Sequence, residues 1–331
     1  MAKLLIVDSN YPDVAVERAV LAPFDAEIVD ARIRERRIPD EWLPRLPEFD
    51  AVITSGKPLG ARELPHLRRC RIVVRRGVGF DTIDLPTANS LKIPVANVPD
   101  YGTEEVATHA MALLLLAARR LDIYMAGVRE GDWSARRAGD LHRLVGRTLG
   151  IVGYGRIGRA VARRAPGFGL RVVACDPYAP DDGSVPRVSF AELLASADYV
   201  TIHTPLTAET RRMIDAAALA AMRPGAILVN TARGPIVDPD ALLAALRSGK
   251  LAAAALDVHD VEPVPVDHPL LKEPNFLPTP HSAYYTLESA ADMRRLAVEE
   301  VARVWGGQDP RSWVNPEAGR QRLEPGWRPE T

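Results

Sequence analysis

Short apolar runs alternate with amphipathic stretches along the first hundred residues. The apolar runs are Lys3–Asp8, Glu27–Asp30, Ala51–Thr54, Ile72–Arg75 and Pro94–Asn97. Short apolar segments separated by helical patterns are typical of parallel strands whose two faces are both covered by helices. The pattern therefore predicts a doubly wound α/β domain in this part of the chain.

A second block with the same alternation begins at Thr148. Its predicted strands are Leu149–Val152, Arg171–Cys175, Tyr199–His203, Ala226–Asn230 and Ala253–Leu256. The helices predicted between them are Arg156–Ala165, Phe190–Ala195, Asp215–Met222 and Pro239–Ser248. A chain of 331 residues is long enough for two domains, so we expect a second parallel sheet with its own core.

Two longer helices are predicted outside these strands. One starts near Thr103 and ends on Arg119 and Arg120, and the other covers Leu287–Trp305. The stretch from Gly319 to Thr331 is polar and rich in proline, which predicts a mobile tail.

Composition excludes several classes of partner. The formal net charge is -1, which argues against a nucleic-acid or acidic-membrane partner. The longest apolar run, Ala110–Ala118, is far shorter than the roughly 20 residues that span a bilayer, and the first residues lack a signal-peptide pattern. Two cysteines make no disulfide framework. We expect a soluble, cytoplasmic protein.

A glycine-rich turn follows the predicted strand Leu149–Val152 and opens the next predicted helix. It reads Gly153-Tyr154-Gly155-Arg156-Ile157-Gly158. In a dinucleotide-binding motif such glycines allow a tight turn, an approach to the pyrophosphate and close helix packing. Asp176 ends the following strand, where a carboxylate binds the ribose hydroxyls and repels a 2′-phosphate. The motif predicts NAD as the cofactor.

Three later segments place polar residues where predicted strands end. They are Asn230-Thr231-Ala232-Arg233-Gly234, Asp257-Val258-His259-Asp260-Val261-Glu262-Pro263 and Pro280-His281-Ser282-Ala283. The carboxyl ends of strands face the ligand in a doubly wound sheet, so these residues can converge on a nicotinamide ring. The spacing of His, Cys and Asp gives no indication of a metal site.

These segments, together with Gly77-Val78-Gly79-Phe80-Asp81 and Thr201-Ile202-His203-Thr204-Pro205-Leu206, resemble the D-isomer-specific 2-hydroxyacid dehydrogenases. The resemblance runs from about Lys3 to Pro316. The stretch Val98–Val106 and the ending His281–Tyr285 look like the branch that contains the C-terminal binding proteins and their bacterial enzyme relatives.

The resemblance implies an acid–base site. Arg233 is expected to bind the substrate carboxylate with its planar fork and to polarise the C2 carbonyl. His281 is expected to exchange a proton with the substrate oxygen, and Glu262 to fix the His281 tautomer and favour the charged imidazole. The expected product is a D-2-hydroxy acid or its 2-keto partner, with hydride moving to or from nicotinamide.

Further contacts follow from the same resemblance. The expected cofactor contacts are the glycine motif, Asp176, His203, Thr204, Pro205, Thr231, Ala232, Asp257 and Ala283. The expected substrate contacts are Val78, Gly79 and Arg233 from the resemblance, together with Lys57 and Arg75 as nearby cations and Tyr101 and Tyr284, whose rings either close the pocket or pack between the domains.

The expected architecture is two Rossmann-like doubly wound parallel-sheet domains with a cleft between them. Residues 1–100 and 288–331 are predicted to form a discontinuous, flavodoxin-like substrate domain, and residues 101–287 the NAD domain. The resemblance also implies a homodimer through the cofactor domain.

The sequence leaves the substrate open. D-3-phosphoglycerate dehydrogenases carry an arginine where this chain has Thr54, although Lys57, Arg75 and Arg76 could accept a phosphate, a phosphonate or a second carboxylate. The alternative function is an NAD-sensing, protein-binding module like the corepressors of the same branch, with little turnover.

Overall fold

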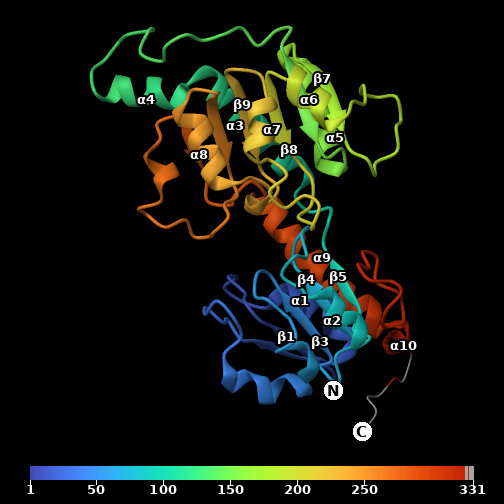
Figure 1. Cartoon of the computed structure of the whole chain (residues 1–331). Helices are drawn as coiled ribbons and strands as arrows, with labels where there is room; N and C mark the ends of the chain where they lie inside the picture. The colour runs from blue at the N-terminus through green and yellow to red at the C-terminus, as the bar shows by residue number, and fades with distance from the viewer. Residues whose placement is uncertain (325–326, 328–331) are drawn as a thin grey trace. The chain divides into compact units, whose positions relative to one another are not determined.

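The computed structural model describes residues 1–324 and 327, and it divides into two compact units (Figure 1). Unit 1 contains Met1–Gly102 and the chain from Thr286 onward, and unit 2 contains Thr103–Tyr285. Assigning the substrate to unit 1 and the cofactor to unit 2 remains a prediction at this point.

Unit 1 is built on a sheet of parallel strands. The strands are β1 (Lys3–Ile6), β2 (Glu27–Asp30), β3 (Ala51–Thr54), β4 (Ile72–Arg75) and β5 (Val95–Asn97). Their order is β2-β1-β3-β4-β5, the flavodoxin-like doubly wound order. The predicted parallel α/β class is confirmed here, and β1 and β5 are each shorter than the apolar run that predicted them.

Helices cover both faces of the unit 1 sheet. The helices are α1 (Ala15–Leu21), α2 (Leu85–Ser90), α9 (Leu287–Trp305) and α10 (Arg320–Leu323). Leu4, Ile6 and Val74 pack on one face with α9 residues such as Val298, whereas Leu5 and residues of the other face pack with α2. Alternate residues of each strand thus enter different cores, as the period of two requires.

A buried ion pair joins α1 to α9. The Arg294 guanidinium lies 2.7 Å from Oε2 of Glu17, and the two residues are 8% and 3% exposed. The same guanidinium donates to the carboxylate of Asp13 at 3.0 Å. The hydrogen bond to Glu17 raises the pKa of Arg294 although burial acts in the opposite direction. This pair fixes α9 against α1.

The prediction of a mobile tail is wrong for the residues up to 324. Arg320–Leu323 form the short helix α10, and Arg322 donates to the carbonyls of Leu67 and Cys70 at 3.1 and 2.7 Å. A polar composition does not reveal that one arginine donates to several backbone carbonyls of a distant segment. The rest of the tail, apart from residue 327, lies outside the described residues.

Unit 2 contains the second parallel sheet. Its strands are β6 (Thr148–Val152), β7 (Arg171–Cys175), β8 (Tyr199–Ile202), β9 (Ala226–Asn230), β10 (Leu251–Leu256) and β11 (Phe276–Pro278). The order is β11-β10-β9-β8-β6-β7. The chain adds β7 on one side of β6 and then returns to add β8 on the other side, so the gap between β6 and β8 is the switch point of the strand order. Ligands bind at the carboxyl ends of the strands at such a switch point.

Helices also cover both faces of the unit 2 sheet (Figure 1). They are α3 (Thr103–Arg119), α5 (Arg156–Arg164), α6 (Phe190–Ser196), α7 (Ala216–Ala221) and α8 (Pro239–Arg247), whereas α4 (Leu121–Arg129) follows α3 without entering either core. Residues of α3 and α5 share one core, and residues of α6, α7 and α8 share the other. In the described part of the chain, no helix is long and apolar enough to cross a membrane.

Two elements of unit 2 were missed by the sequence pattern. The helix from Thr103 ends at Arg119 as expected, but Arg120 then adopts φ 48° and a separate helix, α4, which was not predicted, follows at once. Strand β11 is only three residues long, too short for a periodic signal. Helix α5 ends at Arg164, one residue earlier than predicted, because Pro166 cannot continue it.

Removing Glu17 should strongly destabilise unit 1. Glu17→Ala leaves a buried guanidinium with Asp13 as its remaining carboxylate, so we expect a loss of about 3 kcal/mol in the free energy of unfolding. Urea unfolding followed by tryptophan fluorescence measures it. The exposed neighbour Arg18 gives the control, since Arg18→Ala should change stability by less than about 0.5 kcal/mol. Equal stability of the two variants contradicts the prediction.

Candidate active site

The glycine turn after β6 lies at the switch point of the unit 2 sheet. Gly153 has φ 90°, and a Cβ there would lie 2.7 Å from the backbone of His203 and Thr204 after β8. A Cβ on Gly158 would lie 2.2 Å from the Gly153 carbonyl oxygen, so α5 packs directly against the turn. At Gly155 an added Cβ would meet no described atom within 4 Å. The open space at Gly155 lies at the start of α5, whose free N–H groups favour a phosphate.

Asp176, directly after β7, is held by three backbone amides. Tyr154 N–H donates to one carboxylate oxygen at 2.7 Å, and the amides of Tyr178 and Ala179 donate to the other at 2.9 and 3.0 Å. Partial burial raises the pKa of Asp176, but these amides and Arg187 outweigh it, so the pKa lies below its ordinary value. The site therefore presents a fixed negative charge beside the glycine turn.

Two shielded polar atoms lie at neighbouring strand ends. His203 follows β8 and Thr231 follows β9, where Ile202 is paired with Asn230. Burial lowers the pKa of His203 to about 3, so the imidazole is neutral. His203 Nδ1 and Thr231 Oγ1 lack a hydrogen-bond partner among the described residues. Unpaired buried polar atoms at this edge fit a polar ligand that runs along it.

Glu262 and His281 form a hydrogen-bonded pair. Oε2 of Glu262 lies 2.7 Å from Nδ1 of His281, and the backbone N–H of His259 donates to Oε1 at 2.9 Å. Burial raises the pKa of Glu262, but the hydrogen bond and charge of His281, together with His259, hold it below its ordinary value. Glu262 is thus an ionised partner that leaves Nε2 of His281 available.

The backbone of His281 is held in a left-handed conformation with φ 54°. Its N–H is shared between the carbonyls of Asp257 and Thr279 at 2.8 and 3.1 Å. The Asp257 carboxylate accepts from the Thr279 hydroxyl at 2.6 Å and from the amides of Ser282 and Ala283 at 2.9 Å. A non-glycine residue with positive φ needs such support from its surroundings.

Two contributors to this arrangement were missed by sequence reasoning. The sequence alone gave neither the Thr279 hydroxyl nor His109 a role in the site. Nε2 of His109 lies 3.2 Å from Oγ1 of Thr279 and 3.6 Å from the carboxylate of Asp257. The sequence carried no signal for this contact, because His109 is 170 residues before Thr279. Asp257 is 1% exposed, so its predicted contact with the cofactor stays a prediction.

Arg233 follows β9, and Glu262 follows the neighbouring strand β10. Its Nη1 donates to the carbonyl of Ala232 at 2.7 Å, and Nδ2 of Asn230 donates to the Arg233 carbonyl at 2.9 Å. The neighbouring Gly234 lies directly against the segment Asp257–Pro263, here called the Glu262 loop. A Cβ on Gly234 would lie 1.9 Å from the carbonyl carbon of His259 in this loop. The three predicted catalytic residues therefore follow β9, β10 and β11, which are adjacent in the sheet.

The predicted substrate contacts of unit 1 lie at the carboxyl end of its own sheet. Val78 follows β4 and accepts a hydrogen bond from Nδ2 of Asn97 at 2.6 Å. The Arg75 guanidinium lies over Gly77, and Nζ of Lys57 donates to the Arg34 carbonyl at 3.3 Å. Tyr101 also approaches Gly77, its hydroxyl 3.6 Å from where a Cβ would be. In unit 2, the rings of Tyr284 and Tyr285 meet edge to face.

Comparison with known proteins supplies the family. Residues 111–283 match the model of the D-isomer specific 2-hydroxyacid dehydrogenase NAD binding domain. A glyoxylate reductase of Korarchaeum cryptofilum is 40% identical over 288 residues, which cover 85% of this chain and 87% of that protein. The chain belongs to the D-isomer-specific 2-hydroxyacid dehydrogenase family. Unit 2 is accordingly an NAD-binding domain.

Other members of the family differ in length and substrate. A D-3-phosphoglycerate dehydrogenase of Methanocaldococcus jannaschii is 34% identical over 95% of this chain, and the match spans 60% of that protein. The crystal structure of a D-lactate dehydrogenase from Aquifex aeolicus, complexed with NAD and lactic acid, has a TM-score of 0.84. It is 29% identical, and the match covers 94% of this chain and 98% of that chain. In our structure, the described residues contain no cluster of His, Cys, Asp and Glu side chains that could hold a metal ion.

Gly234→Ala should lower activity with NADH and a 2-keto acid by about 10²-fold, because the new methyl group forces the Glu262 loop away from Arg233. Steady-state kinetics measure it. Gly167→Ala is the control, since a Cβ there meets no described atom within 4 Å and it should leave activity unchanged. Normal turnover by Gly234→Ala would show that the close approach of the two loops does not matter.

Proposed function

We propose that this chain interconverts a small D-2-hydroxy acid and its 2-keto acid with NAD, through Arg233, Glu262 and His281. The observation that carries the proposal is the 2.7 Å contact between Glu262 and His281 at the carboxyl edge of an NAD-binding sheet. An imidazole paired with an ionised carboxylate is suited to exchange a proton near neutral pH.

The residues at the glycine turn fit NAD. The amides at the start of α5 and the open space at Gly155 suit the pyrophosphate, and Asp176 suits the ribose hydroxyls. The fixed charge of Asp176 disfavours the extra phosphate of NADP. His203, Thr204, Pro205, Thr231 and Ala232 follow the next two strands and are proposed to continue the site. When bound, nicotinamide supplies the hydride chemistry.

His281 is proposed to move the proton at its Nε2 atom. Nδ1 is engaged by Glu262, so Nε2 is the ring atom that meets the substrate oxygen. During reduction Nε2–H protonates the carbonyl oxygen, and during oxidation neutral Nε2 removes the hydroxyl proton. The carboxylate of Glu262 stabilises the charged imidazole and fixes its orientation.

Arg233 is proposed to bind the carboxylate that every 2-keto acid carries. A guanidinium offers two parallel N–H donors that match two carboxylate oxygens. From unit 1, backbone amides of Val78 and Gly79 are proposed to bind the same group. Ala283 and Asp257 are proposed beside the nicotinamide end of the cofactor.

The remainder of the substrate is proposed to be small. Lys57, Arg75, Tyr101 and Tyr284 are the proposed contacts to the group beyond C2. Thr54 is buried and its hydroxyl donates to the Lys57 carbonyl at 3.3 Å, so this position offers no cation for a phosphate. The relatives are named for glyoxylate, phosphoglycerate and lactate, and the first and last of these favour a short acid.

The test is NADH oxidation with glyoxylate, pyruvate, hydroxypyruvate, 3-phosphohydroxypyruvate and phosphonopyruvate. We expect turnover with NADH, and the highest kcat/KM for an acid without phosphate. A preference for a phosphorylated acid overturns the proposed size and charge of the substrate. Absence of turnover with every acid overturns the proposed function.

His281→Ala should lower kcat by about 10²–10⁴-fold while NADH binding is kept, because proton transfer is lost but the glycine turn is untouched. Steady-state kinetics and NADH fluorescence titration measure the two effects. His142→Ala, at an exposed histidine, is the control and should behave like the wild type. A His281→Ala variant with near-normal kcat removes the acid–base assignment.

A homodimer is proposed through the apolar side of α4. Leu121, Met125 and Val128 are exposed and, at spacings of four and three, lie on one side of this helix. The indole of Trp133 just beyond α4 is 88% exposed. Large side chains exposed together in this way favour burial against another protein surface.

A cytoplasmic location likewise stays a prediction.

Met125→Glu combined with Trp133→Glu should convert the dimer to a monomer, because charges replace the apolar side chains of the contact. Light scattering after size-exclusion chromatography measures the mass. Val266→Glu, at an exposed valine elsewhere in unit 2, should remain dimeric. An unchanged dimer mass in the double variant places the interface elsewhere.

A further inference from the structure

A second histidine, His259, links the two segments that carry Glu262 and His281. Its backbone N–H donates to Oε1 of Glu262 at 2.9 Å. Its ring Nε2 lies 3.1 Å from the carbonyl oxygen of Thr279, two residues before His281. One residue therefore bonds to the carboxylate with its main chain and to the imidazole-bearing turn with its side chain.

The two histidines bond to the same oxygen atom. The Thr279 carbonyl accepts from the backbone N–H of His281 at 3.1 Å and from Nε2 of His259 at the same distance. A carbonyl oxygen can only accept, so Nε2 of His259 must carry the hydrogen. His259 thus adds a second donor to the turn that holds His281 at φ 54°.

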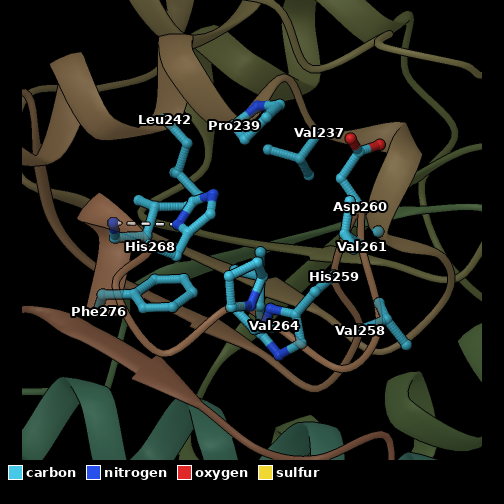
Figure 2. A pocket seen from close by; sticks show the side chains of 14 residues that line it. Val237, Pro239, Leu242, Val258, His259, Asp260, Val261, Val264, His268 and Phe276 are labelled. Carbon is cyan, nitrogen blue, oxygen red and sulfur yellow. Dashed lines mark hydrogen bonds between the residues drawn. The ribbon is translucent and has the colours of Figure 1, made fainter.

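The His259 ring is held in place by apolar packing. It meets the ring of Phe276 edge to face, with centroids 6.0 Å apart. The ring also lines a pocket of about 100 Å³ behind the Glu262 loop, together with Val264, Leu242 and His268. Figure 2 shows His259 beside Val264, with Phe276 and His268 along another part of the wall.

Few alternative partners are available to the ring within this pocket. Apart from His259, the polar side chains on the wall are His268 and Asp260. Nδ1 of His268 already accepts the amide of Leu270 at 3.2 Å. The bond to the Thr279 carbonyl joins the packed His259 ring to the turn that carries His281, while the main chain of His259 bonds to Glu262.

We propose that His259 is a positioning residue, whose two N–H groups hold Glu262 and His281 in hydrogen-bonded register for proton transfer. The inference rests on the proposed function of that pair. His259 acts through Glu262 and His281 and not on the substrate. Its ring adds a favourable charge when protonated, since His259 is one of the groups that hold the pKa of Glu262 low after burial has raised it.

Three variants of His259 separate the N–H donor from the ring. His259→Phe keeps an aromatic ring against Phe276 and lacks the donor. His259→Gln supplies an amide N–H that can reach the Thr279 carbonyl, and His259→Met has similar length without a donor. We expect kcat to fall by up to about 100-fold for Phe and Met, and to stay within about threefold of wild type for Gln.

The KM for NADH should stay unchanged in all three variants, because the glycine turn and Asp176 lie on other strands. Steady-state kinetics with NADH and the best 2-keto acid of the panel measure both parameters. If His259→Phe fails to fold, the Gln and Met variants, judged by melting temperature and kcat, decide alone. Equal kcat in Gln and Met, whether high or low, overturns the proposal.

His268→Asn is the matched control on the same pocket wall. An Asn oxygen can still accept the Leu270 amide, so kcat should equal that of wild type. Failure of this inference is distinguishable from failure of the proposed function: wild type and His268→Asn then turn over normally and His259→Phe matches them. Failure of the proposed function leaves wild type itself inactive with every acid.

Discussion

The buried carboxylate of Asp257 organises the end of the unit 2 sheet. It lies at the end of β10 and accepts hydrogen bonds from three groups of the Thr279–Ala283 turn. A charge removed from water is costly unless donors surround it, so this carboxylate favours a conformation in which the turn folds back onto β10. His281 adopts its left-handed backbone in that conformation, and its ring meets Glu262.

Glycines, which have no side chain, are as important as the charged residues at the carboxyl edge of the unit 2 sheet. Gly153, Gly158 and Gly234 each occupy a place where a methyl group would overlap the backbone of another segment. The first two bring β6, β8 and α5 together at the switch point, and the third brings the Arg233 segment against the Glu262 loop. The glycine turn that faces the cofactor and the segments that carry Arg233 and Glu262 therefore depend on the same condition. In both places one main chain approaches another so closely that a Cβ would not fit.

Local patterns were enough to predict most strands, the glycine turn and the pairing of Glu262 with His281. Each carries a short-range signal: an apolar run, a fixed glycine spacing or a family motif. The failures have two causes, local backbone conformation or short length for α4 and β11, and distant partners for α10 and His109. Helix α4 follows a left-handed Arg120, β11 is too short for a period, and α10 is held by Arg322 donating to carbonyls of Leu67 and Cys70. His109 reaches Thr279 only through the tertiary fold.

The two-segment construction of unit 1 has a consequence for synthesis on the ribosome. Leu4, Ile6, Ile53 and Val74 are covered by α9 residues that lie at the far end of the chain. The Glu17 carboxylate likewise gains its ion-pair partner only when Arg294, 277 residues later, has been synthesised. Unit 2 is complete in the nascent chain before α9 emerges, so the apolar surface that α9 covers stays exposed on the first hundred residues until α9 has been synthesised. The order of completion is therefore fixed by topology: the inserted unit first, the enclosing unit last.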